Sequence, residues 1–112
     1  MTSISSKLDK VKDALVNIKG LTVKHYFRSG LTAPYCIWAE DGEGKSLHGN
    51  NKKLNQSLSG TVDLFTKSEN DPFADSIQEA LNDAENVAWY LNSVQREEET
   101  ELVHYEWVFE VS

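Results

Sequence analysis

The sequence predicts an α+β domain with a mainly antiparallel sheet of about five strands and two helices packed on it. Three observations support this fold class. Two segments repeat apolar residues at helical spacing, several others alternate apolar and polar residues, and most of the alternating segments are joined by connections of hairpin length. The order is helix, three strands, helix, two strands, and the length fits one domain over residues 1–112.

The first helix is expected at the N-terminus, where Ser5 or Ser6 is a suitable N-cap and Gly20 suits the position after the helix. Its apolar face has spacings of four and three residues: Ile4, Leu8, Val11, Leu15 and Ile18. The opposite face is polar: Lys7, Lys10, Asp13 and Asn17. We interpret the segment as a helix packed on the sheet rather than one offered to a partner, because amphipathic surface helices are common.

Two strands are predicted next, in "LTVKHYFRSG" with a turn at Ser29 and Gly30, and in "APYCIWAED" after Pro34. Apolar residues occupy both faces of the second strand: Tyr35, Ile37 and Ala39 on one, Cys36 and Trp38 on the other. This strand is therefore expected to be central or covered on both sides. Cys36 is the one cysteine, so one chain can form neither a disulfide nor a cysteine zinc site, and we expect a buried thiol.

The stretch "SGTVDLFTKSENDPFADSIQEAL" predicts a strand, a polar turn and a helix. Residues 57–67 alternate, Asp71 is a natural N-cap, and Pro72 suits the first helical position. The helix should end by Glu85, and one of its faces is apolar: Phe73, Ile77, Ala80, Leu81 and Ala84. The acidic residues at this joint are therefore interpreted as capping and surface residues.

The last third predicts two strands, "NVAWYLNSVQ" and "ELVHYEWVFEVS", joined by the turn "REEET". The final strand alternates strictly, which is typical of an antiparallel strand against a core. Its apolar face carries Val103, Tyr105, Trp107, Phe109 and Val111. Its other face carries Leu102, His104, Glu106, Val108 and Glu110.

The overall charge is acidic, with 18 acidic and 11 basic side chains and a formal net charge of −7. Such a surface repels phosphate backbones, so conventional nucleic-acid binding is disfavoured, although an acidic wall would let DNA pass without sticking. The N-terminus lacks the apolar block of a signal peptide, and no run is long enough to span a bilayer. We expect a protein made and kept in a reducing cytoplasm.

Residues 41–56, "DGEGKSLHGNNKKLNQ", show no core periodicity and form a long connection between strands. We interpret this segment as a projecting arm. A flexible hairpin tip without a function is an alternative of equal weight. Its candidate residues for oligomer formation or ring docking are Lys45, His48, Asn50, Asn51, Lys52 and Lys53.

The second candidate segment is the acidic turn between the last two strands. Its acids are Glu97, Glu98, Glu99 and Glu101. A solvated hairpin tip is the ordinary interpretation, and a basic partner such as the arm lysines, within the chain or between subunits, is the alternative. These acids are candidates for an acidic lumen or surface.

The patterns typical of catalytic and metal sites are not found. Asp63, Asp71 and Asp75 lack the alternating oxygen ligands of a calcium loop, and the three histidines form no zinc motif. His104 is expected to pair across strands with a neighbour. The sequence "GKS" after Gly44 lacks the spacing and context of a phosphate loop. We therefore expect no enzyme activity, no cofactor and no metal.

The linear pattern resembles the small tail-terminator, or tail-completion, proteins of long-tailed phages and prophages of Gram-positive bacteria. The resemblance covers residues 33–111 and rests on "APYCIWAED", on "VDLFTK" leading into a helix, and on the terminal "HYEWVFEV". It implies an α+β domain that assembles into a ring, commonly a hexamer, on the last ring of the tail tube. Such a ring stops tail polymerisation and presents a joining surface to the head connector.

The resemblance also implies partners and a location. The expected partners are further copies of the chain, the tail tube protein and the head connector or completion protein, while DNA passes through the ring without specific binding and no membrane is involved. The expected location is the tail of the virion, and the host cytoplasm during assembly. The alternatives are another head–tail joining or minor structural phage protein, and an acidic protein-interaction or inhibitor module.

Overall fold

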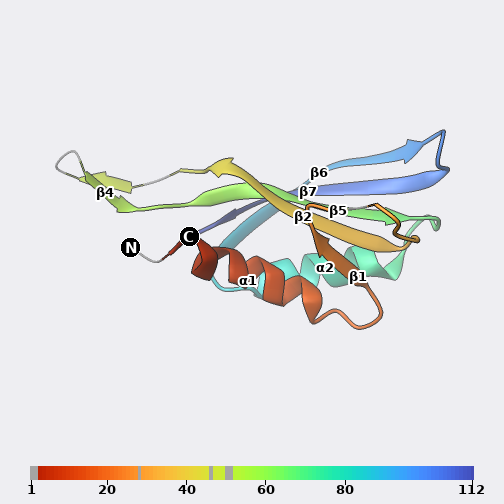
Figure 1. Cartoon of the computed structure of the whole chain (residues 1–112), viewed down its shortest axis with the longest axis horizontal. Coiled ribbons are helices and arrows are strands. Elements are labelled where there is room, and N and C mark those ends of the chain that lie inside the picture. The colour runs from red at the N-terminus through yellow and green to blue at the C-terminus, as the bar shows by residue number, and fades with distance from the viewer. Residues whose placement is uncertain (1–2, 28, 46, 50–51) are drawn as a thin grey trace.

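The structure is a computed structural model that describes residues 3–27, 29–45, 47–49 and 52–112, without the side chains of residues 47–49, 52 and 54. It forms two layers, a five-stranded sheet and two helices that lie on one face of it (Figure 1). The helices are α1 (Ile4–Val16) and α2 (Pro72–Asp83). The strands of this sheet are β1 (Thr22–His25), β2 (Tyr35–Glu43), β5 (Leu58–Thr66), β6 (Val87–Glu97) and β7 (Leu102–Val111).

The strand order is β1-β2-β5-β7-β6, and every neighbouring pair is antiparallel except β1 and β2. The predicted α+β class and the order of the elements are confirmed. The predicted turn at Ser29 and Gly30 does not make a hairpin, because β1 and β2 run parallel and the chain between them must return across the sheet. Leu31 and Ala33 of this connection pack on the face opposite the helices.

The main core lies between the helices and the sheet. Trp107, Phe109 and Val111 of β7 are fully buried there, as the alternation of the last strand predicted. Ile77 and Leu81 of α2 close the core from the helix side. Cys36 is also fully buried, as expected, and burial together with the negative charge of Asp63 raises the pKa of its thiol.

A smaller core lies on the opposite face of the sheet. Tyr35 and Ile37 of β2 pack there against Phe65 of β5, with Leu31 and Ala33 over them. This second core explains why Tyr35–Trp38 of β2 are buried on both faces, and the prediction of a strand covered on both sides is confirmed. No described helix is long and apolar enough to cross a membrane.

The helix termini follow local sequence signals with two corrections, both in α1. This helix ends at Val16 with Asn17 as its C-cap, so Gly20, which has a φ of 82°, lies in the turn that follows and not directly after the helix. Asp71 caps α2 by accepting from Phe73 N at 2.8 Å, and Pro72 is the first helical residue, as predicted. Helix α1 is capped by Ser3 rather than by Ser5 or Ser6, because Ser3 Oγ accepts from Ser6 N at 3.1 Å.

Two residues of α1 differ from the predicted faces. Lys7, predicted on the polar face, is fully buried, because it lies four residues before Val11 at the border of the apolar stripe. Ile4, predicted on the apolar face, is 53% exposed, because it is the first residue of the helix.

Candidate functional site

The segment predicted as a projecting arm is a short β-hairpin built from β3 (Leu47–Gly49) and β4 (Lys52–Asn55). We call residues 44–57 the arm. The arm extends past the five-stranded sheet at one end of a molecule that measures 52 × 26 × 23 Å (Figure 1). The segment predicted as a long connection between strands contains an antiparallel pair of its own, and β2 continues into it as far as Glu43.

The base of the arm is fixed to the sheet by hydrogen bonds. Lys45 N donates to Glu110 Oε1 at 2.7 Å, and Gly44 N donates to Ser57 O at 2.9 Å. Glu43 Oε1 accepts from Lys53 Nζ and, at 3.0 Å, from Gln56 Nε2. The arm therefore has a defined direction, because donors from both of its sides are bonded to the sheet strands.

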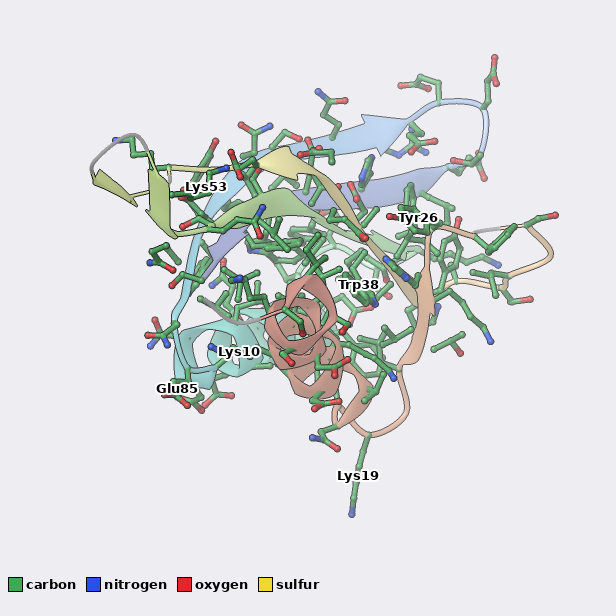
Figure 2. All side chains as sticks on the ribbon, turned by 60° about the vertical axis from the view of Figure 1, so that its left-hand side comes forward. Lys10, Lys19, Tyr26, Trp38, Lys53 and Glu85 are labelled. Atoms are coloured by element: carbon green, nitrogen blue, oxygen red, sulfur yellow. The ribbon has the colours of Figure 1, made fainter. Side chains whose placement is uncertain are left out.

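The structure describes the side chains of only two of the six candidate residues of the arm. The Lys45 side chain is exposed near the base, and Lys53 lies half-buried on β4, where Figure 2 labels it. His48 and Lys52 belong to β3 and β4, and their side chains lie outside the described residues, as do Asn50 and Asn51 entirely.

The acidic turn, residues 97–101, lies at the opposite end of the long axis, where β6 turns into β7 (Figure 1). Glu97 is half-buried, with Oε1 3.6 Å from His104 Nδ1, and Glu98 is exposed, 3.4 Å from Arg96. Glu99 and Glu101 are exposed. Since the arm and the acidic turn lie at opposite ends of the molecule, the arm lysines do not neutralise these acids within one chain. A pairing of the arm lysines with the acidic turn is therefore possible only between two chains.

His104 forms the cross-strand pair that its position predicted. Its Nε2 lies 2.7 Å from Asp63 Oδ1, and its ring stacks on Phe65 with centroids 4.2 Å apart. Glu106, opposite Asp63 in the register, accepts from Asn92 Nδ2 at 3.1 Å. Each carboxylate thus has a donor, and the described residues contain no group of three or more His, Cys, Asp or Glu able to hold a metal ion.

The sequence interpretation missed an aromatic stack at the end of β1. The His25 ring lies 3.9 Å from the Trp38 ring and 4.0 Å from the Tyr26 ring, both nearly parallel, and Figure 2 labels the two outer members. His25 Nε2 donates to Glu40 Oε1 at 2.6 Å. Tyr26 has a φ of 70°, which is unusual for an aromatic residue and turns the chain back after β1. The aromatic pair "YF" after a short strand was the available signal.

The carboxyl of Glu40 is stabilised in its charged form. Partial burial raises its pKa, but the hydrogen bonds from His25, its own backbone and Tyr26, with the charge of His25, outweigh burial and lower the pKa below 4.5. The same bond to Glu40, with burial and the negative charge of Glu40, raises the pKa of Tyr26.

A lowered carboxyl pKa contributes stability that is present above 4.5 and is lost as the pH falls through the folded-state value. We therefore expect Glu40→Gln to lower the free energy of unfolding by up to about 1 kcal/mol at neutral pH, and this difference should shrink below pH 4.5. Urea unfolding at pH 7, 4.5 and 3.5 measures it. Glu85→Gln, at an exposed residue after α2, is the control. A wild-type advantage that grows on acidification would contradict the assignment.

Large apolar side chains are exposed at the two end strands of the sheet, directly after β1 and on β6. After β1, Tyr26 is 54% and Phe27 is 76% exposed. On β6, Tyr90 is 57%, Leu91 44% and Val94 50% exposed. Their periodicity predicted strands but could not show which strands would be the end strands, so these surfaces were not identified from the sequence.

The sequence matches no protein-family model and no curated protein. The fold does match solved structures. One is a chain described as "Virion of native gene transfer agent (GTA) particle", with a TM-score of 0.60 and 14% sequence identity. The match covers 99% of this chain and 97% of that chain. The two chains therefore share a fold over almost their whole length, and at this identity the likeness shows the fold alone.

Proposed function

We propose that this protein is a structural component of a phage-like particle, and specifically a tail terminator. In this proposal it assembles as a ring, a hexamer, on the tip of the tail tube. The ring stops tail polymerisation and forms the joining surface to the head connector. The observation that carries the proposal is the fold match to a chain of a gene transfer agent virion, which covers both chains almost completely.

Two properties of the described residues support an assembly role. The arm is fixed at its base by hydrogen bonds to Glu110 and Glu43, and it extends past the sheet, as suits a contact with a neighbouring subunit or ring. The net charge of −7 suits a ring through which DNA passes without being bound. The proposal includes no enzyme activity and no cofactor.

The decisive experiment measures tail-tube length. Purified tail tube protein from the same phage or prophage is allowed to polymerise alone and with this protein, and the tubes are imaged by negative-stain microscopy. We expect shorter tubes that carry a cap at one end, with growth resuming only at uncapped ends. Tubes that keep their length and bind none of the added protein would refute the terminator role.

Shortening the arm tests directly whether the arm is needed for ring formation and for capping of the tail tube. Because Gly44 N bonds to Ser57 O, the two ends of the arm lie side by side, and an Asn-Gly turn can replace residues 45–56. We expect a folded variant, with a melting temperature near that of wild type, that neither forms rings nor caps tubes. A shortened variant that caps tubes as well as wild type would exclude the arm from assembly. Lys19→Ala, at an exposed residue after α1 that leaves the arm unchanged, is the control.

The other candidates make different predictions in the same experiment. Another head–tail joining protein would bind the head connector but leave tube length unchanged. An acidic interaction module would be a stable monomer with one tight basic partner, and the exposed Glu98, Glu99 and Glu101 of the acidic turn favour it as the second candidate.

A further inference from the structure

The five-stranded sheet ends in two open strand edges. Strands β1 and β6 are the end strands, and within the described residues neither has a strand paired with its outer side. Open edges present backbone N–H and C=O groups that can accept another strand. The register of β6 shifts between Leu91 and Ser93, which leaves two straight segments of five residues, 87–91 and 93–97. Each is long enough for the four residues of β1.

The two edges carry opposite charge. Strand β1 holds one basic residue, Lys24, and no acidic one, and the nearby Glu40 of β2 is paired with His25. From residue 87 to residue 101, which covers β6 and the acidic turn, it holds four glutamates and one basic residue, Arg96. We call the first the basic edge and the second the acidic edge. Unlike edges therefore attract.

Both edges also expose apolar side chains that a contact would bury. Phe27 and Tyr26 follow β1, and Leu91 and Val94 project from β6, all more than two-fifths exposed. Val94 borders a hollow beside the α2 N-terminus that also includes Asn70 and Tyr105. An aromatic side chain placed there would remove apolar surface of both partners from water.

Strand direction permits the contact with ordinary geometry. Following the pairings across the sheet, β1 runs opposite to β6. A second copy placed at the end of the sheet in the same orientation therefore sets its β1 antiparallel to β6 of the first copy. The helices of both copies then lie on the same face of the continued sheet, as a closed ring requires.

We infer that the basic edge of one copy binds the acidic edge of the next, so that β1 adds as an antiparallel strand to β6. This inference rests on the proposed function, because it specifies the contact between ring subunits, and it assigns the acidic turn to that contact instead of the lumen. A two-fold pairing of β6 with β6, or of β1 with β1, would not set Lys24 against the acidic turn and would gain no such attraction. The contact is therefore head-to-tail, which generates a ring when the rotation closes.

The test uses two variants of the full chain. In each variant both edges carry charge of the same sign, so copies of that variant should not associate with one another. Lys24→Glu makes both edges acidic, and Glu98→Lys with Glu99→Lys makes both edges basic. Light scattering across a concentration series, at low and high salt, measures association. The matched controls reverse exposed charges on α1: Lys12→Glu for the first variant, and Asp9→Lys with Asp13→Lys for the second.

We expect each edge variant alone to associate about tenfold or more weakly than wild type at low salt, with a smaller difference at high salt. The two variants mixed one to one should regain association, because every contact then joins an acidic edge to a basic one. The controls should behave like wild type. Recovery on mixing cannot come from misfolding, and circular dichroism of each variant checks the fold.

Three results would overturn the inference. These are a wild type that stays monomeric up to its solubility limit, edge variants that associate like wild type, and a mixture no stronger than its parts. None of them would by itself remove the terminator role, which is judged by tube length. Conversely, wild type that self-associates through these edges but leaves tube length unchanged would keep the inference and refute the terminator role.

Discussion

Gly60→Ala should destabilise the protein by about 3 kcal/mol or more, enough to unfold a large share of a marginally stable domain. Gly60 lies in β5 between Glu40 of β2 and Phe109 of β7. A Cβ atom there would lie 2.1 Å from Ala39 O, 2.7 Å from Glu40 Cα and 2.7 Å from Phe109 Cζ. Ala39 O and Glu40 Cα are backbone atoms of β2, so no rotation of a flexible side chain relieves the overlap.

Gly42→Ala is the matched control. Gly42 lies in β2, where the register with β5 shifts between Glu40, the partner of Gly60, and Gly42. A Cβ added at Gly42 meets no atom within 4 Å. We expect its free energy of unfolding, measured in urea, to stay within about 0.5 kcal/mol of wild type. Equal stability of the two variants would show that β2 and β5 are not as close at Gly60 as the structure has them.

Trp107→Ala should cost about 3–5 kcal/mol, the range for removing a buried aromatic side chain. Trp107 is fully buried between the sheet and the helices. Its Nε1 donates to Gln78 Oε1 of α2 at 3.1 Å, and its ring stacks with Tyr105 at 5.8 Å between centroids. The substitution thus opens a cavity in the main core and also removes the hydrogen bond that joins α2 to β7.

Two further variants separate these contributions. Trp107→Phe keeps a buried aromatic ring but loses the N–H group and part of the ring volume, so we expect about 1–2 kcal/mol of destabilisation. Tyr90→Ala removes an aromatic ring that is 57% exposed and should change stability by under about 1 kcal/mol. Urea unfolding followed by circular dichroism measures all three. A Trp107→Ala loss no larger than that of Tyr90→Ala would contradict the position of the core.

The fold was predictable because its strongest elements are locally encoded. The strict alternation of β7 and the Asp71-Pro72 cap of α2 are determined by neighbouring residues, and both predictions are confirmed. The parallel pairing of β1 with β2 was not predictable from the sequence, because it depends on how Leu31 and Ala33, which lie between the two strands, pack on the second core. The burial of Lys7 depends likewise on packing at the border of the α1 stripe.

The candidate surfaces were predictable only in part. Composition identified the arm and the acidic turn as unusual segments, but their positions at opposite ends of the molecule follow from the sheet order. The same order makes β1 and β6 the end strands and so exposes Phe27 and Val94, which alternation alone would assign to ordinary strands and turns. The exposed edges are therefore a property of the topology.

The central claim is that this protein assembles into a closed ring. The most direct measurement is the mass in solution by light scattering, with negative-stain images of the same wild-type samples. We predict a single discrete species whose mass is a fixed multiple of 12.6 kDa and whose images are rings with a central opening. A mass equal to one chain at every concentration, with no rings in the images, would contradict it.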